Sequence, residues 1–149
     1  MNIDLFTAPT HHRTLGLPNP RTLDVKLKGI PNLIKADCIH LPIKDNAFDL
    51  TISNHLIEHI EEPLQLLREM LRVTKPNGEI KIATPHKLSH SRKWYLHKHS
   101  FNLSWFAKAF RLLHVEMVKT SKNYKYYPHE HFPLVRVPYF IQVTGRVKK

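Results

Sequence analysis

The alternation of apolar and polar residues along the chain predicts a series of short strands. The clearest is Phe48–Ile52, where apolar and polar positions alternate with the period of two that is typical of a strand with one buried face. A second strand, Glu79–Ala83, follows the turn residues Pro76–Gly78. Shorter apolar runs are further strand candidates, at residues 2–6, 21–25, 32–36, 115–118 and 139–143.

Two helices are predicted from apolar residues that recur at helical spacing. Glu61-Glu62-Pro63 opens the first, because acidic residues favour the positive end of the helix dipole and proline fits the first turn. Lys75–Gly78 ends it. Asn102 is the expected N-cap of the second helix, whose apolar stripe is Leu103, Phe106, Phe110 and Leu113. Residues 124–138, rich in Tyr, His and Pro, predict a long loop.

Strands that alternate with helices and end in a strand pair predict an α/β sandwich. Its sheet should be mostly parallel, with an antiparallel pair of strands at the C-terminal end. The chain has 149 residues, of which 42% are hydrophobic, which suits one globular domain over residues 1–149. It shows no internal repeat and no low-complexity linker, so we expect no second domain.

Charge divides the chain into two halves. Residues 1–85 hold ten basic and ten acidic residues, whereas residues 86–149 hold thirteen basic residues and only Glu116 and Glu130, which accounts for the net charge of +11. The second half would attract a nucleic acid or another polyanion, although a merely solvated basic surface explains the charge equally well. The single cysteine, Cys38, and the lack of an apolar leader or membrane-spanning run predict a cytoplasmic protein.

An ordered series of short motifs occupies the middle of the chain. Residues 37–50 carry an aspartate, a Leu41-Pro42 corner and a Phe48-Asp49 strand start; Leu56-Ile-Glu-His-Ile60, Glu69-Met-Leu-Arg-Val73 and Lys75-Pro-Asn-Gly78 follow. In order and spacing this series resembles the class I S-adenosylmethionine-dependent methyltransferases, specifically from about Asp24 to Pro85. The resemblance implies a Rossmann-like fold and S-adenosylmethionine as the cofactor of a methyl transfer to an acceptor that the sequence does not identify.

The resemblance also implies a set of cofactor-binding residues at the carboxyl ends of the strands, where ligands bind in open parallel sheets. Asp24 would accept from both ribose hydroxyls, and Asp37 from the exocyclic amine of adenine, with Cys38 contributing its backbone amide. Ser53, Asn54 and His55 would lie near the sulfonium and the acceptor. Taken singly, Asp24 and Asp37 are better explained as turn or cap residues, whereas their joint spacing favours the cofactor site.

His55 is the candidate catalytic residue. Methyl transfer is an in-line displacement that depends mainly on positioning, and a general base is needed only if the acceptor must lose a proton. Histidine side chains exchange protons near neutral pH, which suits that role. Glu58 and His59 are expected to orient the loop and the helix entry instead.

The N-terminal segment departs from the family pattern. Where such enzymes carry a glycine-rich turn after the first strand, this chain has Ile3-Asp-Leu-Phe-Thr-Ala-Pro9. Asp4 matches the acidic position and Thr7 falls within the turn, so both are assigned to the cofactor site, yet Phe6 adds bulk where close approach is needed. The chain is therefore either a minimal enzyme or a methyltransferase-like binding or assembly module without activity. Since one sheet face would be under-covered, we expect a homodimer or another partner.

Several histidine motifs compete with this interpretation. His55-Leu-Ile-Glu-His59 fits the pattern of inverted zinc peptidases, but Pro63 would place the regular helix after it. The pairs at residues 97/99 and 129/131 have metal-ligand spacing on a strand, which twelve histidines make common by chance, so no metal is expected. Aromatic residues interleave with bases in the second half, where Lys93, Lys122 and Lys125 would contact a nucleic acid in the alternative function.

Overall fold

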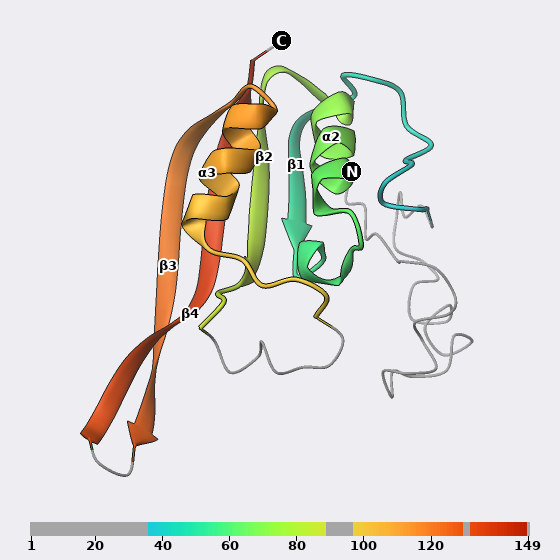
Figure 1. The fold of residues 1–149 in the computed structure, drawn as a ribbon. Helices are drawn as coiled ribbons and strands as arrows, with labels where there is room; N and C mark the ends of the chain where they lie inside the picture. The colour runs from blue at the N-terminus through green and yellow to red at the C-terminus, as the bar shows by residue number, and fades with distance from the viewer. Residues whose placement is uncertain (1–35, 89–96, 130–131, 149) are drawn as a thin grey trace, which may run out of the picture. The chain divides into compact units, whose positions relative to one another are not determined.

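The computed structural model describes residues 36–88, 97–129 and 132–148, with the backbone alone for residues 125–129 and 132–137 (Figure 1). The chain divides into two compact units, Met1–Pro42 and Ile43–Lys149, each of which is described by itself. The expectation of a single domain stays a prediction. The expected strands at 2–6 and 21–25, and all but the last residue of the one at 32–36, lie outside the described residues.

The larger unit is an α/β structure with a mixed sheet. Its four described strands lie in the order β1-β2-β4-β3, with β1 parallel to β2 and the other two pairings antiparallel. The α/β class and the antiparallel C-terminal strand pair are confirmed, whereas only one of the three described pairings is parallel in the sheet that was expected to be mostly parallel. In chain order the elements are β1 (Phe48–Asn54), the 3-10 turn η2 (Ile57–His59), α2 (Pro63–Val73), β2 (Thr74–Pro85), α3 (Leu103–Leu112), β3 (Val115–His129) and β4 (Phe132–Val147).

Both predicted helices form, and they begin at the residues that the sequence predicts as helix starts. Pro63 is the first residue of α2, and the helix ends at Val73, two residues before the predicted stop signal begins at Lys75. Asn102 caps α3, because its Oδ1 accepts a hydrogen bond from the backbone N–H of Trp105 at 2.9 Å. The local sequence therefore sets the beginning of each helix.

The segment after the first helix joins the sheet rather than forming a separate turn. Thr74 already pairs with Phe48 of β1, and the register then shifts before Leu50 pairs with Glu79. Asn77 takes up the extra length with a φ of 63°, in the left-handed region that asparagine tolerates. The Pro76–Gly78 signal thus marks an irregularity at the start of β2.

The predicted loop at residues 124–138 is wrong. These residues extend β3 and β4 into a long antiparallel hairpin, in which Tyr124 pairs with Pro138 and His129 with Phe132. Register shifts at Asn123/Tyr124 and Tyr127/His129 accommodate the irregular composition. Backbone pairing with a neighbouring strand has overridden the local turn signals, as β-structure commonly allows.

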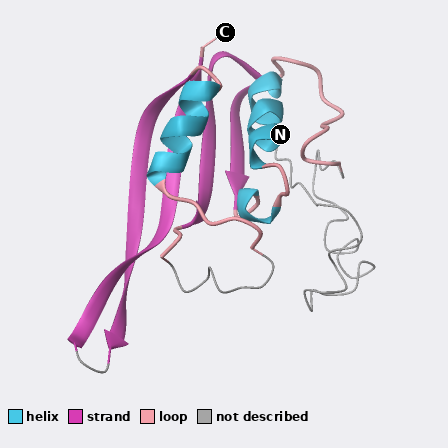
Figure 2. Cartoon of the chain, in the orientation of Figure 1, coloured by secondary structure: helices cyan, strands magenta, loops and turns pink. Residues whose placement is uncertain are grey.

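The core lies between one face of the sheet and the two helices, which both cover that face (Figure 2). β1 turns Leu50 and Ile52 away from this core, and these side chains are 41% and 53% exposed. Within the described part of the chain, no helix is long and apolar enough to span a bilayer. The largest fully buried apolar side chains are Phe101, Phe106, Phe110, Ile57, Leu66, Leu67, Ile80, Ile82 and Ile141.

Candidate functional site

The carboxyl ends of the two parallel strands bring the central motif residues to one edge of the sheet. Asn54, the last residue of β1, pairs with Ala83, two residues before the end of β2. Phe140 of β4 pairs with Pro85 at the same edge. Ligands of open α/β sheets bind beyond such carboxyl ends, so this edge is the candidate site.

Ser53 and Asn54 end β1 with opposite exposure. The Ser53 side chain is buried, with 3% of the residue exposed, and its Oγ has no hydrogen-bond partner among the described residues. Asn54 is exposed. A buried hydroxyl without a partner costs free energy, so Ser53 Oγ is a polar atom with unused bonding capacity at this edge.

His55 leaves the strand in a left-handed conformation. Its φ is 49°, and its backbone N–H donates to the carbonyl of Ala83 at 2.9 Å. The ring lies 5.0 Å from that of Phe140, measured between centroids, and the side chain is 55% exposed. Its Nδ1 lies 3.3 Å from Glu58 Oε1, an ion-pair distance when the imidazole is protonated.

Glu58 is the buried centre of the site. Only 1% of the residue is exposed, and its Oε2 accepts a hydrogen bond from Thr84 Oγ1 at 2.9 Å. Its Oε1 accepts no hydrogen bond from the described residues, because the approach of His55 lies outside hydrogen-bond geometry. The backbone N–H groups of Lys98 and His99 donate to the Glu58 carbonyl at 2.9 and 3.2 Å. The sequence suggested an orienting role for Glu58, but not its burial.

Two further histidines approach the same carboxylate. His59 Nε2 lies 4.0 Å from Glu58 Oε1, and the His59 and His97 rings meet edge to face at 4.9 Å between centroids. Burial lowers the pKa of His97, and the nearby His59 adds to this effect, whereas Glu58 opposes it. Spacing along the sequence pairs His97 with His99, whereas the structure brings His97 to His59, a contact that no local spacing indicates.

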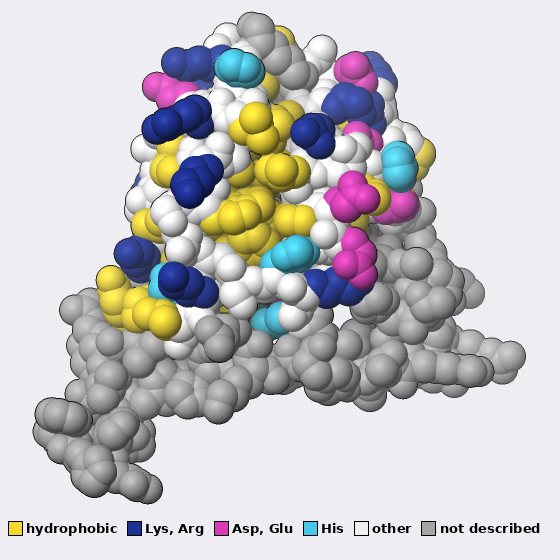
Figure 3. Space-filling view, in the orientation of Figure 1, with side chains coloured by type: hydrophobic (Ala, Val, Ile, Leu, Met, Phe, Trp, Pro, Cys, Tyr) yellow, Lys and Arg dark blue, Asp and Glu magenta, His cyan; other side chains and the backbone are white. Residues whose placement is uncertain are grey.

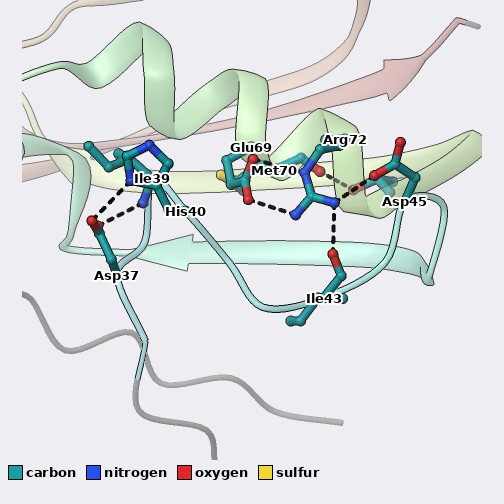
Figure 4. A network of polar contacts seen from close by, with 9 residues as sticks. Asp37, Ile39, His40, Ile43, Asp45, Glu69, Met70 and Arg72 are labelled. Carbon is teal, nitrogen blue, oxygen red and sulfur yellow. Dashed lines mark hydrogen bonds and ion pairs between the residues drawn. The ribbon is translucent and has the colours of Figure 1, made fainter.

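Asp37 and Cys38 belong to the N-terminal unit, and the described contacts of Asp37 are local. Asp37 Oδ1 accepts from the Ile39 N–H at 3.1 Å, and Oδ2 lies 3.2 Å from His40 Nδ1 (Figure 4). The Ile39 hydrogen bond, followed by His40, lowers the pKa of Asp37. Burial raises the pKa of the Cys38 thiol to about 11. The other predicted cofactor residues, Asp4, Thr7 and Asp24, lie outside the described residues.

Arg72 forms hydrogen bonds with three other residues of the motif series. Its guanidinium donates to both carboxylate oxygens of Glu69, at 3.0 and 2.7 Å, and to Asp45 Oδ1 and the Ile43 carbonyl at 2.6 and 2.7 Å (Figure 4). The Glu69 and then the Asp45 hydrogen bonds raise the pKa of Arg72 above its ordinary value. This part of the motif series therefore anchors the turn before β1 to α2, a structural role.

Comparison with known proteins finds similarity to methyltransferases. Residues 16–82 match the family model described as a methyltransferase domain. An "uncharacterized methyltransferase" of Mycobacteroides abscessus is 36% identical over 75 residues, which is half of this chain and a quarter of that relative. The chain therefore spans about a quarter of the length of the curated relative that it matches.

Two solved structures have similar folds. One is a chain from a Haloferax volcanii complex that contains the Trm112 methyltransferase activator. It gives a TM-score of 0.67 at 16% identity, and the alignment covers 99% of this chain and 72% of that chain. The other is a SAM-dependent methyltransferase of Aquifex aeolicus, with a TM-score of 0.60 at 18% identity. The alignment covers 85% of this chain and 61% of that protein's chain. At these identities the likeness concerns the fold.

Proposed function

Because residues 16–82 match a methyltransferase family model and the fold is similar to that of solved methyltransferases, we propose that the chain is a class I S-adenosylmethionine-dependent methyltransferase, which binds S-adenosylmethionine and transfers the methyl group to an acceptor. One observation carries the proposal: β1 and β2 end at the same edge, with the exposed Asn54 and His55 and with Ser53 Oγ, which has no hydrogen-bond partner among the described residues. The cofactor, when bound, supplies an electrophilic methyl group on a sulfonium.

The proposed cofactor contacts follow the family pattern residue by residue. Asp24 would hold the ribose hydroxyls, while Asp37 and the Cys38 amide would hold the adenine. The local hydrogen bonds to Asp37 leave it capacity for this, because a carboxylate offers about four acceptor sites. Ser53 and Asn54 would face the sulfonium end, and Asp4 and Thr7 the segment where relatives carry glycines.

His55 and Glu58 would act as a base and its orienting partner. With Nδ1 beside Glu58 Oε1 at 3.3 Å, the exposed ring can present Nε2 to an acceptor that must lose a proton. The buried carboxylate would then stabilise the imidazolium as the acceptor attacks. As the acceptor takes the methyl group and S-adenosylhomocysteine is left, His55 Nε2 would accept the proton that the acceptor loses.

The decisive experiment is calorimetric titration of the full chain with S-adenosylmethionine and S-adenosylhomocysteine. We expect binding of both, and we expect Asp24→Asn to weaken it by about 1–3 kcal/mol through the loss of ribose hydrogen bonds. Asp49→Asn is the matched control, because Asp49 is an exposed aspartate paired with Lys75. Folded protein that gives no heat with either ligand would falsify the proposal.

A second candidate function is polyanion binding without catalysis. On the helix-bearing face, most Asp and Glu side chains gather over the α2 side, whereas Lys and Arg side chains lie over both sides, with little acidic charge beside those on the α3 side (Figure 3). Lys119 and Lys122 of the outer strand β3 are exposed. Salt-sensitive binding of single-stranded RNA or DNA that weakens on charge reversal at Lys122, or at Lys93 and Lys125, would support this function. No binding at low salt would exclude it.

The remaining expectations about partners and location stay predictions. Exposed Leu50 and Ile52 lie on one face of β1, where a second copy of the chain would cover them. Light scattering after size exclusion measures the oligomeric state directly. A cytoplasmic location accords with the free, buried Cys38 and can be checked by fractionating cells.

A further inference from the structure

We propose that Glu58, His59 and His97 form a binding site for a divalent transition-metal ion, with zinc as the best-suited metal. One oxygen of Glu58 and one ring nitrogen of each histidine lie within 4.8 Å of one another. Two imidazoles and a carboxylate are a ligand set that zinc prefers, with the fourth position left to water. The site shares Glu58 with the proposed methyl-transfer residues, but metal binding does not depend on that function.

The spacing of the three ligands leaves a small adjustment to make. Tetrahedral zinc with bonds of about 2.0–2.1 Å keeps its ligand atoms about 3.3 Å apart. Glu58 Oε1 and His59 Nε2 are already 4.0 Å apart, and no pair exceeds 4.8 Å. Closing this difference requires the two histidine side chains, which are only partly buried, to rotate toward Glu58 Oε1.

The carboxylate is fixed for this role. The hydrogen bond from Thr84 Oγ1 occupies Oε2 and holds the carboxylate so that Oε1 is the oxygen nearest His59, the arrangement of a metal ligand with an outer-shell donor. Oε1 is buried and accepts no hydrogen bond from the described residues. A buried carboxylate oxygen without such a donor has bonding capacity that a cation would satisfy.

The segment that carries His97 is tied to the turn that carries the other two ligands. Besides the two backbone hydrogen bonds to the Glu58 carbonyl, Lys98 forms an ion pair with Glu61, and His99 Nε2 lies 3.1 Å from the Glu61 carbonyl oxygen. The ligands are therefore brought together before any metal arrives.

The test is titration of the metal-free full chain with Zn²⁺ against a chromophoric chelator, with Co²⁺ absorption as a reporter of coordination. We expect one tight site per chain and the intense visible bands of tetrahedral Co²⁺. His97→Gln should weaken binding at least about tenfold and remove those bands. His114→Asn is the control: it removes an exposed histidine from a position with φ of 53°, which asparagine tolerates.

Each outcome decides the proposal. Equal weakening by His97→Gln and His114→Asn would mean that dispersed surface histidines bind the metal, which overturns it, as does the lack of a stoichiometric site. Because Glu58 is buried, Glu58→Gln is interpreted only if circular dichroism shows a native melt, and His59→Gln provides the second ligand test. The titration contains no S-adenosylmethionine, so its failure leaves the methyltransferase proposal untouched, and the reverse also holds.

Discussion

Thr84 Oγ1 donates a 2.9 Å hydrogen bond to Glu58 Oε2, joining a strand end to the turn after β1 across 26 positions of sequence. Both residues are fully buried, with 0% and 1% exposed. Each proposal for this edge depends on where that carboxylate points. In the methyl-transfer proposal it orients His55, and in the metal proposal it presents Oε1 to His59 and His97.

Thr84→Val should destabilise the protein by about 1–3 kcal/mol, because it removes the donor to a buried carboxylate oxygen while keeping the side-chain volume. Urea unfolding followed by circular dichroism measures the change. Thr84→Ser keeps the hydroxyl and should recover much of the loss. If the valine variant is as stable as the wild type, the hydrogen bond does not hold Glu58 in place.

The elements with local signals were predictable from sequence, and those that depend on distant pairing were not. Pro63 and Asn102 mark helix starts through backbone chemistry within one turn, so α2 and α3 were foreseen. The extension of β3 and β4 depends on each strand finding the other, and Pro138 within this stretch argued for a loop. Tertiary pairing decided the outcome there.

The same division applies to the site. His55 and Glu58 are three positions apart, and their sequence neighbourhood already indicated an orienting role. Thr84 and His97 reach Glu58 and His59 only because β2 runs parallel to β1 and the segment before α3 crosses the strand ends. A metal-ligand motif search along the sequence pairs His97 with His99 and misses this arrangement.

Arg72→Lys should lower the free energy of unfolding by about 1 kcal/mol, since lysine cannot form the forked contact with Glu69 and also reach Asp45 and Ile43. Partial exposure of the guanidinium keeps the figure modest. Lys75→Gln is the control, because its pair with Asp49 is largely exposed and should contribute little. Equal effects of the two substitutions would contradict a special role for Arg72.

His86 should make the protein less stable as the pH falls. The residue is 6% exposed, its Nδ1 accepts a hydrogen bond from the Leu88 N–H at 3.1 Å, and burial, followed by Lys122 and Lys87, lowers its pKa. The unfolded chain therefore binds a proton at higher pH than the folded one. The contribution of His86 to the free energy of unfolding is fully present above the ordinary histidine pKa. It is lost as the pH falls from there through the lower pKa that His86 has in the folded state.

The measurement for His86 is urea unfolding at about pH 8 and about pH 5.5. His86→Gln should cost more stability at the higher pH, because the wild type has already lost part of the histidine contribution at the lower one. A difference between wild type and variant that does not change with pH would show that His86 does not titrate between the folded and unfolded states in this range.

Gly145→Ala should destabilise the protein by about 1–3 kcal/mol through overpacking. A Cβ at this position would lie 2.5 Å from Val115 Cγ1 and 2.7 Å from Phe110 Cε2, closer than real contacts allow. The double variant Gly145→Ala/Val115→Ala should lose less stability than the sum of the losses in the two single variants, by at least about 0.5 kcal/mol. Additive losses of stability would show that the added Cβ does not clash with Val115. Gln142→Ala, on the exposed side of β4, is the control for the effect of alanine itself in this strand.

Ser53→Ala separates stability from cofactor binding at the end of β1. Because Ser53 Oγ is buried with no partner among the described residues, its removal should leave the free energy of unfolding unchanged or raise it slightly. If the hydroxyl faces the cofactor as proposed, the same substitution should weaken S-adenosylhomocysteine binding by about 1 kcal/mol.

Thr51→Val, on the same strand, should have the opposite pattern. Thr51 Oγ1 lies 2.9 Å from Thr74 Oγ1, and Thr74 Oγ1 donates to the Met70 carbonyl at 2.6 Å, so the hydroxyl belongs to a satisfied network away from the strand end. Its loss should lower stability by about 1 kcal/mol and leave S-adenosylhomocysteine binding unchanged. Urea unfolding and calorimetry on both variants give four values. If Ser53→Ala instead destabilises the fold and does not change S-adenosylhomocysteine binding, Ser53 has a structural role and does not contact the cofactor.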